Sequence, residues 1–218
     1  LYLLLFFRIK LSEKRQISST YDSVDRESKD CRNLKEKLYT GIKYSQNFLQ
    51  CTGSEIEQLL IFHSTEFSNL YTVSNKAENL IKVSKVHFRI NNCLFTKCSF
   101  KKSMIYSDNK QYNLTMLSNT ISNCFNLYNS ISSSNIVKSN SLYADIQGNE
   151  VIFEDVNHAC RAFYFERSTN TIFKENVVKN ANVDDCTGSA VTFNAVGSGI
   201  PVQITDCSFT NCNANKGS

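Results

Sequence analysis

One short element recurs along the chain and restricts the folds open to it. The hexapeptide CLFTKC at residues 93–98 returns almost unchanged as CSFTNC at residues 207–212. More generally, an apolar residue is followed three positions later by cysteine or asparagine, as in Phe95/Cys98, Ile121/Cys124, Phe173/Asn176 and Phe209/Cys212. Val151 takes the apolar place in the copy that follows QGNE, and the five anchors are separated by 26, 30, 22 and 36 residues. An imperfect period of this length indicates a solenoid.

The segments between these copies favour strands over helices. Short runs at 141–146, 161–168, 188–194 and 201–205 are rich in Phe, Ile, Val and Thr and lack three- and four-residue apolar spacing. Val86, Phe88 and Ile90 alternate with polar residues, as in a half-buried strand. Propeller blades are longer and carry Gly or Trp signatures that are absent here. We therefore predict an all-β fold, a right-handed parallel β-helix of the pectin-lyase-like kind, over residues 48–218 and clearest from residue 86.

In a β-helix, equivalent residues of successive coils stack in rows. The anchors Phe95, Ile121, Val151, Phe173 and Phe209 are expected to form one apolar row. A second row at the turn is expected to hold Cys98, Cys124, Asn176 and Cys212. Buried cysteine behaves as a small apolar residue, and asparagine satisfies turn backbone groups. The exchange of Asn for Cys at one position therefore predicts a structural role and not a metal site.

Residues 1–47 read as a less regular N-terminal segment. Its apolar start, LYLLLFFRIKL, is too short to span a bilayer. It is either the remnant of a signal or membrane segment or an apolar strand or helix cap, and the charged stretch after it reads as a loop or weak helix.

Composition limits the classes of partner. The net charge of +4 is spread along the chain without a basic stripe, which argues against nucleic-acid binding. The chain has 25 Asn residues, which suits many turns, and its 15 Phe and 10 Tyr residues argue against disorder. The sequence predicts no cofactor.

The nine cysteines lack the close pairing of common zinc sites. Buried stacking thiols are the main interpretation, and disulfides remain an alternative in an oxidising compartment. The histidines show no ligand spacing, and a His158/Cys160 nucleophile lacks support. Asn113 begins the one Asn-x-Ser/Thr sequon, a candidate glycosylation site if the chain is secreted.

Carboxylates leave a second class of function open, a polysaccharide-active β-helix enzyme of the lyase or glycosidase type. Neighbouring coils would have to bring acidic groups such as Glu154, Glu175 and Asp185 into one groove. Arg161 and Arg167 are available basic groups for a lyase, but the wider catalytic set of such enzymes is missing.

The repeat resembles that of polymorphic outer-membrane proteins. The resemblance rests on the Phe-x-x-Asn element at Phe173 and Asn176 and on its Cys-ended variants, and it is greatest to the Asn- and Cys-rich trichomonad surface proteins. Gly188-Ser-Ala-Val191 is similar to the Gly-Gly-Ala-Ile element of that family, and the next such element is expected where the chain stops. The resemblance covers roughly residues 86–218. It implies a secreted or surface-displayed β-helix, an adhesin or antigen, anchored to the membrane by another part of a longer chain.

Together these features predict a non-enzymatic repeat module that recognises an extracellular protein or glycan.

Overall fold

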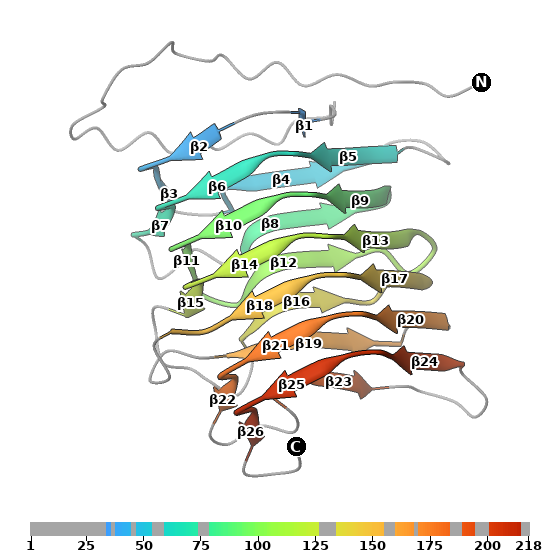
Figure 1. Ribbon diagram of the computed structural model, residues 1–218. Coiled ribbons are helices and arrows are strands. Elements are labelled where there is room, and N and C mark those ends of the chain that lie inside the picture. The colour runs from blue at the N-terminus through green and yellow to red at the C-terminus, as the bar shows by residue number, and fades with distance from the viewer. Residues whose placement is uncertain are drawn as a thin grey trace.

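The computed structural model describes residues 34–35, 38–44, 47–53, 59–73, 79–126, 134–154, 160–167, 170–183, 189–194 and 201–214. Every element assigned within these ranges is a β-strand, and the paired strands are parallel. The strands stack coil upon coil into a parallel β-solenoid (Figure 1), which confirms the predicted fold class.

Three long parallel sheets form the walls of the solenoid. The first sheet contains, in spatial order, β1 (Leu34–Lys35), β5 (Leu59–His63), β9 (His87–Asn91), β13 (Asn113–Leu117), β17 (Tyr143–Gln147), β20 (Asn170–Lys174) and β24 (Val202–Thr205). The second contains β2 (Leu38–Thr40), β6 (Glu66–Ser68), β10 (Leu94–Thr96), β14 (Thr120–Ser122), β18 (Glu150–Ile152), β21 (Val177–Lys179) and β25 (Ser208–Thr210). The third contains β4 (Leu49–Thr52), β8 (Asn79–Ser84), β12 (Ser103–Asp108), β16 (Asn135–Ser139), β19 (Arg161–Glu166) and β23 (Val191–Asn194).

Three two-stranded sheets connect the second and third walls. They pair β3 (Lys43–Tyr44) with β7 (Tyr71–Thr72), β11 (Ser99–Phe100) with β15 (Phe125–Asn126), and β22 (Asn182–Val183) with β26 (Asn213–Ala214).

The repeat is a unit of 12 residues that spans the first and second sheets. It occupies 59–70, 87–98, 113–124, 143–154, 170–181 and 201–212. The sixth residue has a left-handed backbone in all six units, and in one unit it is Gly148 with a φ of +63°. The eleventh residue is also left-handed in five units, as at Lys97 and Asn211. These single residues turn the chain sharply between flat strands.

The core lies inside the coil, where the second and fourth residues of each 12-residue unit point inward. Val86, Phe88 and Ile90 are all buried, which confirms that they share one face. Phe67, Phe95 and Tyr39 continue the core under the second sheet, with the Phe67 and Phe95 rings stacked at 4.7 Å between centroids. Stacked rings are a favourable arrangement for aromatic pairs.

One expectation about the apolar row of the repeat was wrong in register. The row through Phe95 contains Phe67, Phe95, Ile121, Val151, Val178 and Phe209. Phe173 lies in the first sheet, aligned with Ile146 and Ile204, and Val178 takes its expected place. The reason is that apolar-x-x-(Asn or Cys) spacing can occur at either bend: units 87–98, 113–124 and 201–212 have it at both bends, whereas unit 170–181 has it only at the first. With Val178 as the anchor, the spacings become 26, 30, 27 and 31 residues.

The solenoid also begins earlier than predicted. Strands β1, β2 and β3 lie within residues 34–44, where the sequence suggested a loop or weak helix, and they pair with β5, β6 and β7. The apolar start of the chain lies outside the described residues.

Candidate recognition surface

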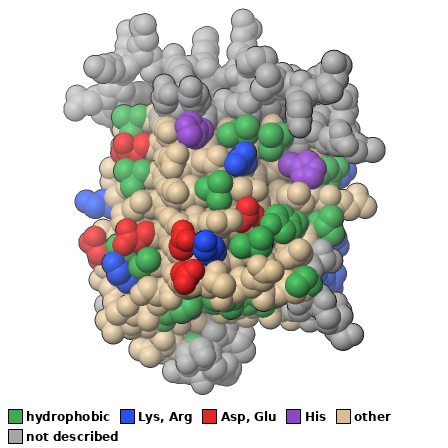
Figure 2. Space-filling view, turned by 45° about the vertical axis from the view of Figure 1, so that its right-hand side comes forward, with side chains coloured by type: hydrophobic (Ala, Val, Ile, Leu, Met, Phe, Trp, Pro, Cys, Tyr) green, Lys and Arg blue, Asp and Glu red, His purple; other side chains and the backbone are tan. Residues whose placement is uncertain are grey.

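The three walls present different chemistry to solvent. On the first sheet, the first, third and fifth residues of each 12-residue unit point outward. Figure 2 shows histidine, basic, acidic and hydrophobic side chains intermixed on one face of the solenoid. Many of the outward residues have planar polar side chains, which offer hydrogen-bond donors or acceptors in one plane. We call this surface the planar-polar face: His63, His87, Arg89, Asn91, Asn113, Asp145, Gln147, Asn170 and Gln203.

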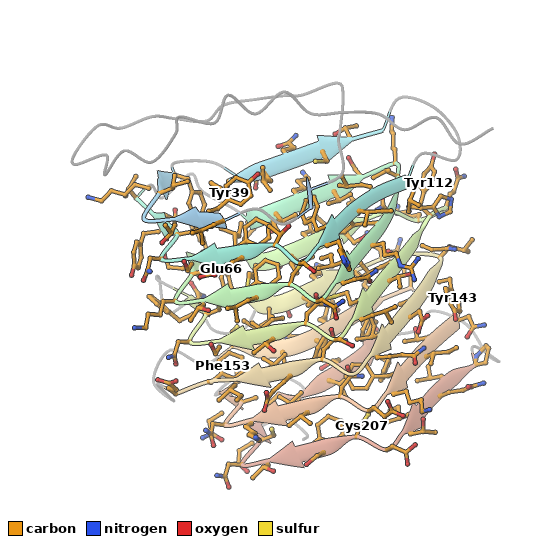
Figure 3. The ribbon with its side chains drawn as sticks, turned by 45° about the horizontal axis from the view of Figure 1, so that its top comes forward. Tyr39, Glu66, Tyr112, Tyr143, Phe153 and Cys207 are labelled. Carbon is orange, nitrogen blue, oxygen red and sulfur yellow. The ribbon has the colours of Figure 1, made fainter. Side chains whose placement is uncertain are left out.

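His87 is held in one orientation at the edge of this face. The backbone N–H of Asn113 donates to its Nδ1 at 3.2 Å, so the neutral ring carries its proton on Nε2. The ring of Tyr112 meets it edge-to-face, with 5.3 Å between centroids. Asn113 in turn aligns with Tyr143 of the next coil. Figure 3 shows Tyr112 and Tyr143 along the same edge of the solenoid.

Further groups on this face are ordered by their neighbours. Gln147 Nε2 donates to Asp145 Oδ1 at 2.6 Å within strand β17. In strand β9, the Asn91 amide is best oriented with its nitrogen donating to the Ile90 carbonyl at 3.0 Å. Its oxygen then accepts a hydrogen bond from Arg89 Nε at 3.1 Å. Burial, with a smaller effect from Asp145, raises the pKa of Tyr143, so its phenol remains a neutral donor at physiological pH. Such pre-ordering lowers the entropy lost on binding.

The second and third sheets present other sets of outward groups. The second presents mainly hydroxyl and aliphatic side chains, with an ion pair of 3.1 Å between Lys179 Nζ and Glu150 Oε1. On the third, Lys138 already lies over the rings of Tyr106 and Tyr164 and pairs with Glu166 at 3.3 Å. The cationic group of Lys138 is thus satisfied within the solenoid itself.

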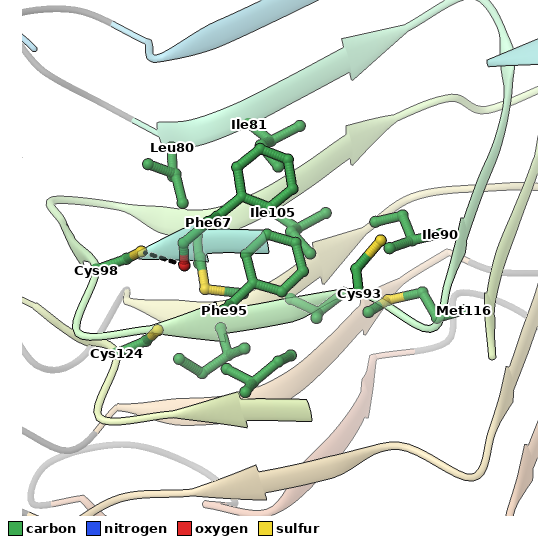
Figure 4. Close-up of a cluster of buried hydrophobic side chains, with 14 of the residues drawn as sticks. Phe67, Leu80, Ile81, Ile90, Cys93, Phe95, Cys98, Ile105, Met116 and Cys124 are labelled. Atoms are coloured by element: carbon green, nitrogen blue, oxygen red, sulfur yellow. Dashed lines mark hydrogen bonds between the residues drawn. The ribbon is translucent and has the colours of Figure 1, made fainter. Parts of the chain in front are cut away.

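The cysteines occupy both bends of the unit, which explains the five-residue spacing of CLFTKC and CSFTNC. Cys93 and Cys207 take the seventh position, and Cys98 and Cys212 the twelfth. The Cys98 thiol donates to the Phe67 carbonyl at 3.4 Å (Figure 4). Burial, with the adjacent Cys98 thiol, raises the pKa of Cys124 well above its usual value.

Asn176 belongs to the first bend and not to the row of Cys98 and Cys124. There it forms a ladder of side-chain amides: Asn119 Nδ2 donates to Asn149 Oδ1 at 2.8 Å, and Asn149 Nδ2 donates to Asn176 Oδ1 at 2.9 Å. The Cys93 N–H continues the ladder by donating to Asn119 Oδ1 at 2.9 Å. The predicted exchange of Asn176 with Cys98 and Cys212 is therefore wrong. Asn does exchange with Cys at the first bend, where Asn176 Nδ2 donates to the Ile146 carbonyl and the Cys207 thiol donates to the equivalent Phe173 carbonyl.

Among the described residues, Cys93, Cys98, Cys124, Cys207 and Cys212 carry free thiols. Within the described ranges, no three His, Cys, Asp or Glu side chains group as metal ligands would.

The carboxylates named from sequence are not brought together. Glu175 lies at the first bend of its unit, whereas Glu154 follows strand β18 at the second bend. Asp185 lies outside the described residues. The neighbour of Glu175 in the next coil is Asp206, a residue that sequence reasoning missed because the register was wrong. Lys174 Nζ pairs with Glu175 Oε1 at 3.0 Å.

The two candidate basic groups are also separate from these acids. Arg161 is only 8% exposed and its guanidinium packs over the Tyr164 ring at 4.7 Å. Arg167 is a left-handed turn residue after β19.

Asn113, the sequon asparagine, begins strand β13 with its side chain on the planar-polar face. Among the described residues no helix has the length and apolar character needed to cross a membrane. No family model, curated protein or solved structure matched the chain.

Proposed function

We propose that this chain is a non-enzymatic recognition module, displayed on a cell surface or secreted, and related in kind to the polymorphic outer-membrane proteins. The observation that supports it is the planar-polar face, where ordered side chains recur on neighbouring strands without converging on one point. Equivalent groups on successive coils suit an extended ligand, bound by many modest contacts. In this proposal the partner is an extracellular protein or glycan, and membrane anchoring belongs to another part of a longer chain.

A polysaccharide-active enzyme is the second candidate. Its one favourable observation is that Glu175 and Asp206 occupy the same bend in adjacent coils, where parallel strands lie about 4.8 Å apart. Against it, the ion pair between Lys174 and Glu175 and the exposure of both side chains suit a solvated surface better than a groove. A catalytic acid normally needs an environment that raises its pKa.

Binding of the purified chain to intact cells and matrix-coated plates tests the proposal. Arg89→Ala, then Arg89→Ala with Asp145→Ala, then both with His63→Ala should weaken binding in steps, because each removes one contact of an extended surface. Lys82→Ala on the third sheet is the matched control and should bind as the parent does.

Two outcomes would contradict the proposal. One is a chain confined to the cytoplasm of its source that binds none of these surfaces. The other is glycan cleavage that is lost in Glu175→Gln or Asp206→Asn, which would establish the enzyme instead.

A further inference from the structure

The first sheet differs from the second in the kind of polar group it presents. Amide, imidazole, guanidinium and carboxylate groups stand side by side on the planar-polar face, whereas the second sheet presents mostly Ser and Thr hydroxyls beside aliphatic groups. Planar groups offer donors and acceptors at fixed angles. They therefore suit a ligand with many hydroxyls in fixed relative positions.

The spacing of these groups is regular along the solenoid. His87, Asn113, Tyr143 and Asn170 align on adjacent parallel strands, as do Arg89, Thr115 and Asp145. Adjacent strands are about 4.8 Å apart, close to the length of one sugar residue in an extended polysaccharide. A linear glycan lying along the solenoid axis would thus meet one polar side chain of the row His87, Asn113, Tyr143 and Asn170 at each successive sugar.

An aromatic edge borders the same rows. Tyr112 packs against His87 and Tyr143 follows one coil later, so rings line the margin of the planar-polar face. Leu142, next to Tyr143, is 42% exposed. Aromatic rings offer an apolar face to the C–H side of a sugar and a polar tip to its hydroxyls.

The charges on the face nearly balance. Arg89 and Asp145 share a row with only Thr115 between them, and Lys174 pairs with Glu175. A sulfated or uronic polysaccharide, or a nucleic acid, would need a surplus of positive charge. The balance favours an uncharged ligand.

We propose that the planar-polar face and its aromatic edge bind a neutral linear glycan that runs along the solenoid axis, with about one sugar per strand. The inference rests on the proposed recognition function and narrows its ligand class. His87 Nε2–H, the Asn113 amide and the Asp145 carboxylate would bind sugar hydroxyls, and Tyr143 would pack on a sugar ring.

The experiment is calorimetric titration of the chain, produced without glycosylation at Asn113, with cellohexaose, xylohexaose and mannohexaose. At least one should bind, and its disaccharide should bind at least about tenfold more weakly, because fewer strands are engaged. Tyr143→Ala and His87→Ala should each weaken binding about tenfold. Tyr164→Ala, which removes an outward ring on the third sheet, is the matched control and should leave affinity unchanged.

His87→Phe separates the two roles of that residue, since it keeps a ring but removes the Nε2–H donor. We expect an affinity between those of His87→Ala and the parent chain.

Three results would overturn the inference. The first is binding of oligogalacturonate or a heparin hexasaccharide in preference to every neutral hexasaccharide. The second is equal affinity in Tyr143→Ala and the parent chain. The third is cell binding that survives enzymatic removal of surface glycans, which would leave the recognition function standing with a protein ligand. If binding to cells and matrix is also absent, the proposed function fails with it.

Discussion

The hexapeptides CLFTKC and CSFTNC take the same positions of the repeat, but their surroundings differ. The first lies between two neighbouring coils, and Phe95 is completely buried. The second belongs to the last described coil, and Phe209 in the same row is 42% exposed. Cys93 and Cys98 are likewise buried, whereas Cys207 and Cys212 are only partly so. The burial of these nearly identical hexapeptides is thus decided by the coils that lie above and below each of them.

Stability in this solenoid therefore comes from stacking between neighbouring coils. Each coil is too thin to bury its own apolar row, as is general for repeat proteins. We therefore expect equivalent substitutions to have very different effects in the two hexapeptides.

The largest difference should follow removal of the phenylalanine ring. Phe95→Ala should lower the free energy of unfolding by about 3–5 kcal/mol, because it leaves a cavity between coils. Phe209→Ala should cost roughly 1–2 kcal/mol, since its ring already contacts water on one side. Chemical denaturation followed by circular dichroism measures both values.

Leu94→Ala is the control for that pair, because Leu94 lies beside Phe95 but points outward. It should change stability by less than about 0.5 kcal/mol. Equal losses in Phe95→Ala and Phe209→Ala would show that stacking does not decide burial energy here.

The apolar surface of the last described coil should also promote self-association of the chain. Ile204, in the same coil as Phe209, is 47% exposed, and among the described residues β24 and β25 are the last strands of their sheets. An apolar edge of this kind promotes association between chains.

We expect concentration-dependent self-association that Phe209→Lys weakens by about tenfold, measured by sedimentation velocity. Leu38→Lys is the matched control, since Leu38 is exposed on the outer face of the second sheet. Equal association of the parent and both variants would exclude this end as the contact.

Much of this organisation could be predicted from sequence, because the strands are short and rich in Phe, Ile and Val and their bends in Asn and Cys. The register of one copy of the repeat, Phe173 to Asn176, could not be predicted from sequence. Phe173 and Asn176 show the same spacing as Phe95 and Cys98, yet they sit at the other bend. Spacing alone cannot distinguish two bends that follow the same steric rule, and only strand pairing separates them.

The planar-polar face was missed for a related reason. His87, Tyr143 and Asp145 are scattered in sequence and become neighbours only when coils of unequal length stack. The connections that lead into and out of the third sheet vary in length, most of all those that lead into it, so no fixed period in the sequence connects these residues. A search at the 12-residue unit, aligned on its two bends, would have brought the rows together.

The pH dependence of thiol labelling should show the same difference between the buried and the partly exposed hexapeptide. Burial raises the pKa of Cys93 to about 11, so little thiolate exists near neutral pH. Its labelling by iodoacetamide should rise about tenfold per pH unit towards pH 11 and remain slower than that of Cys207, which water reaches.

The raised pKa of Cys93 also links stability to pH. The unfolded thiol ionises first, near pH 9, so the neutral buried thiol contributes stability that is present below that pH. This contribution is lost as the pH rises through about 11. Cys93→Ala should therefore show a shallower loss of stability between pH 9 and 11 than the parent chain. Identical slopes would mean that Cys93 does not titrate in the folded state as its burial implies.

The smallest effect should come from the one left-handed position at which the hexapeptides differ. Lys97 has a φ of +52°, and Asn211 has the same φ at the equivalent bend. Asparagine enters this region more readily than lysine, because its short side chain bonds locally to the backbone. Lys97→Asn should therefore raise stability by about 0.5 kcal/mol, measured by denaturation. Lys97→Ala keeps the steric penalty and should show no gain. If Ala stabilises as much as Asn, the lysine side chain itself is unfavourable, and the backbone conformation at this bend is set by stacking alone.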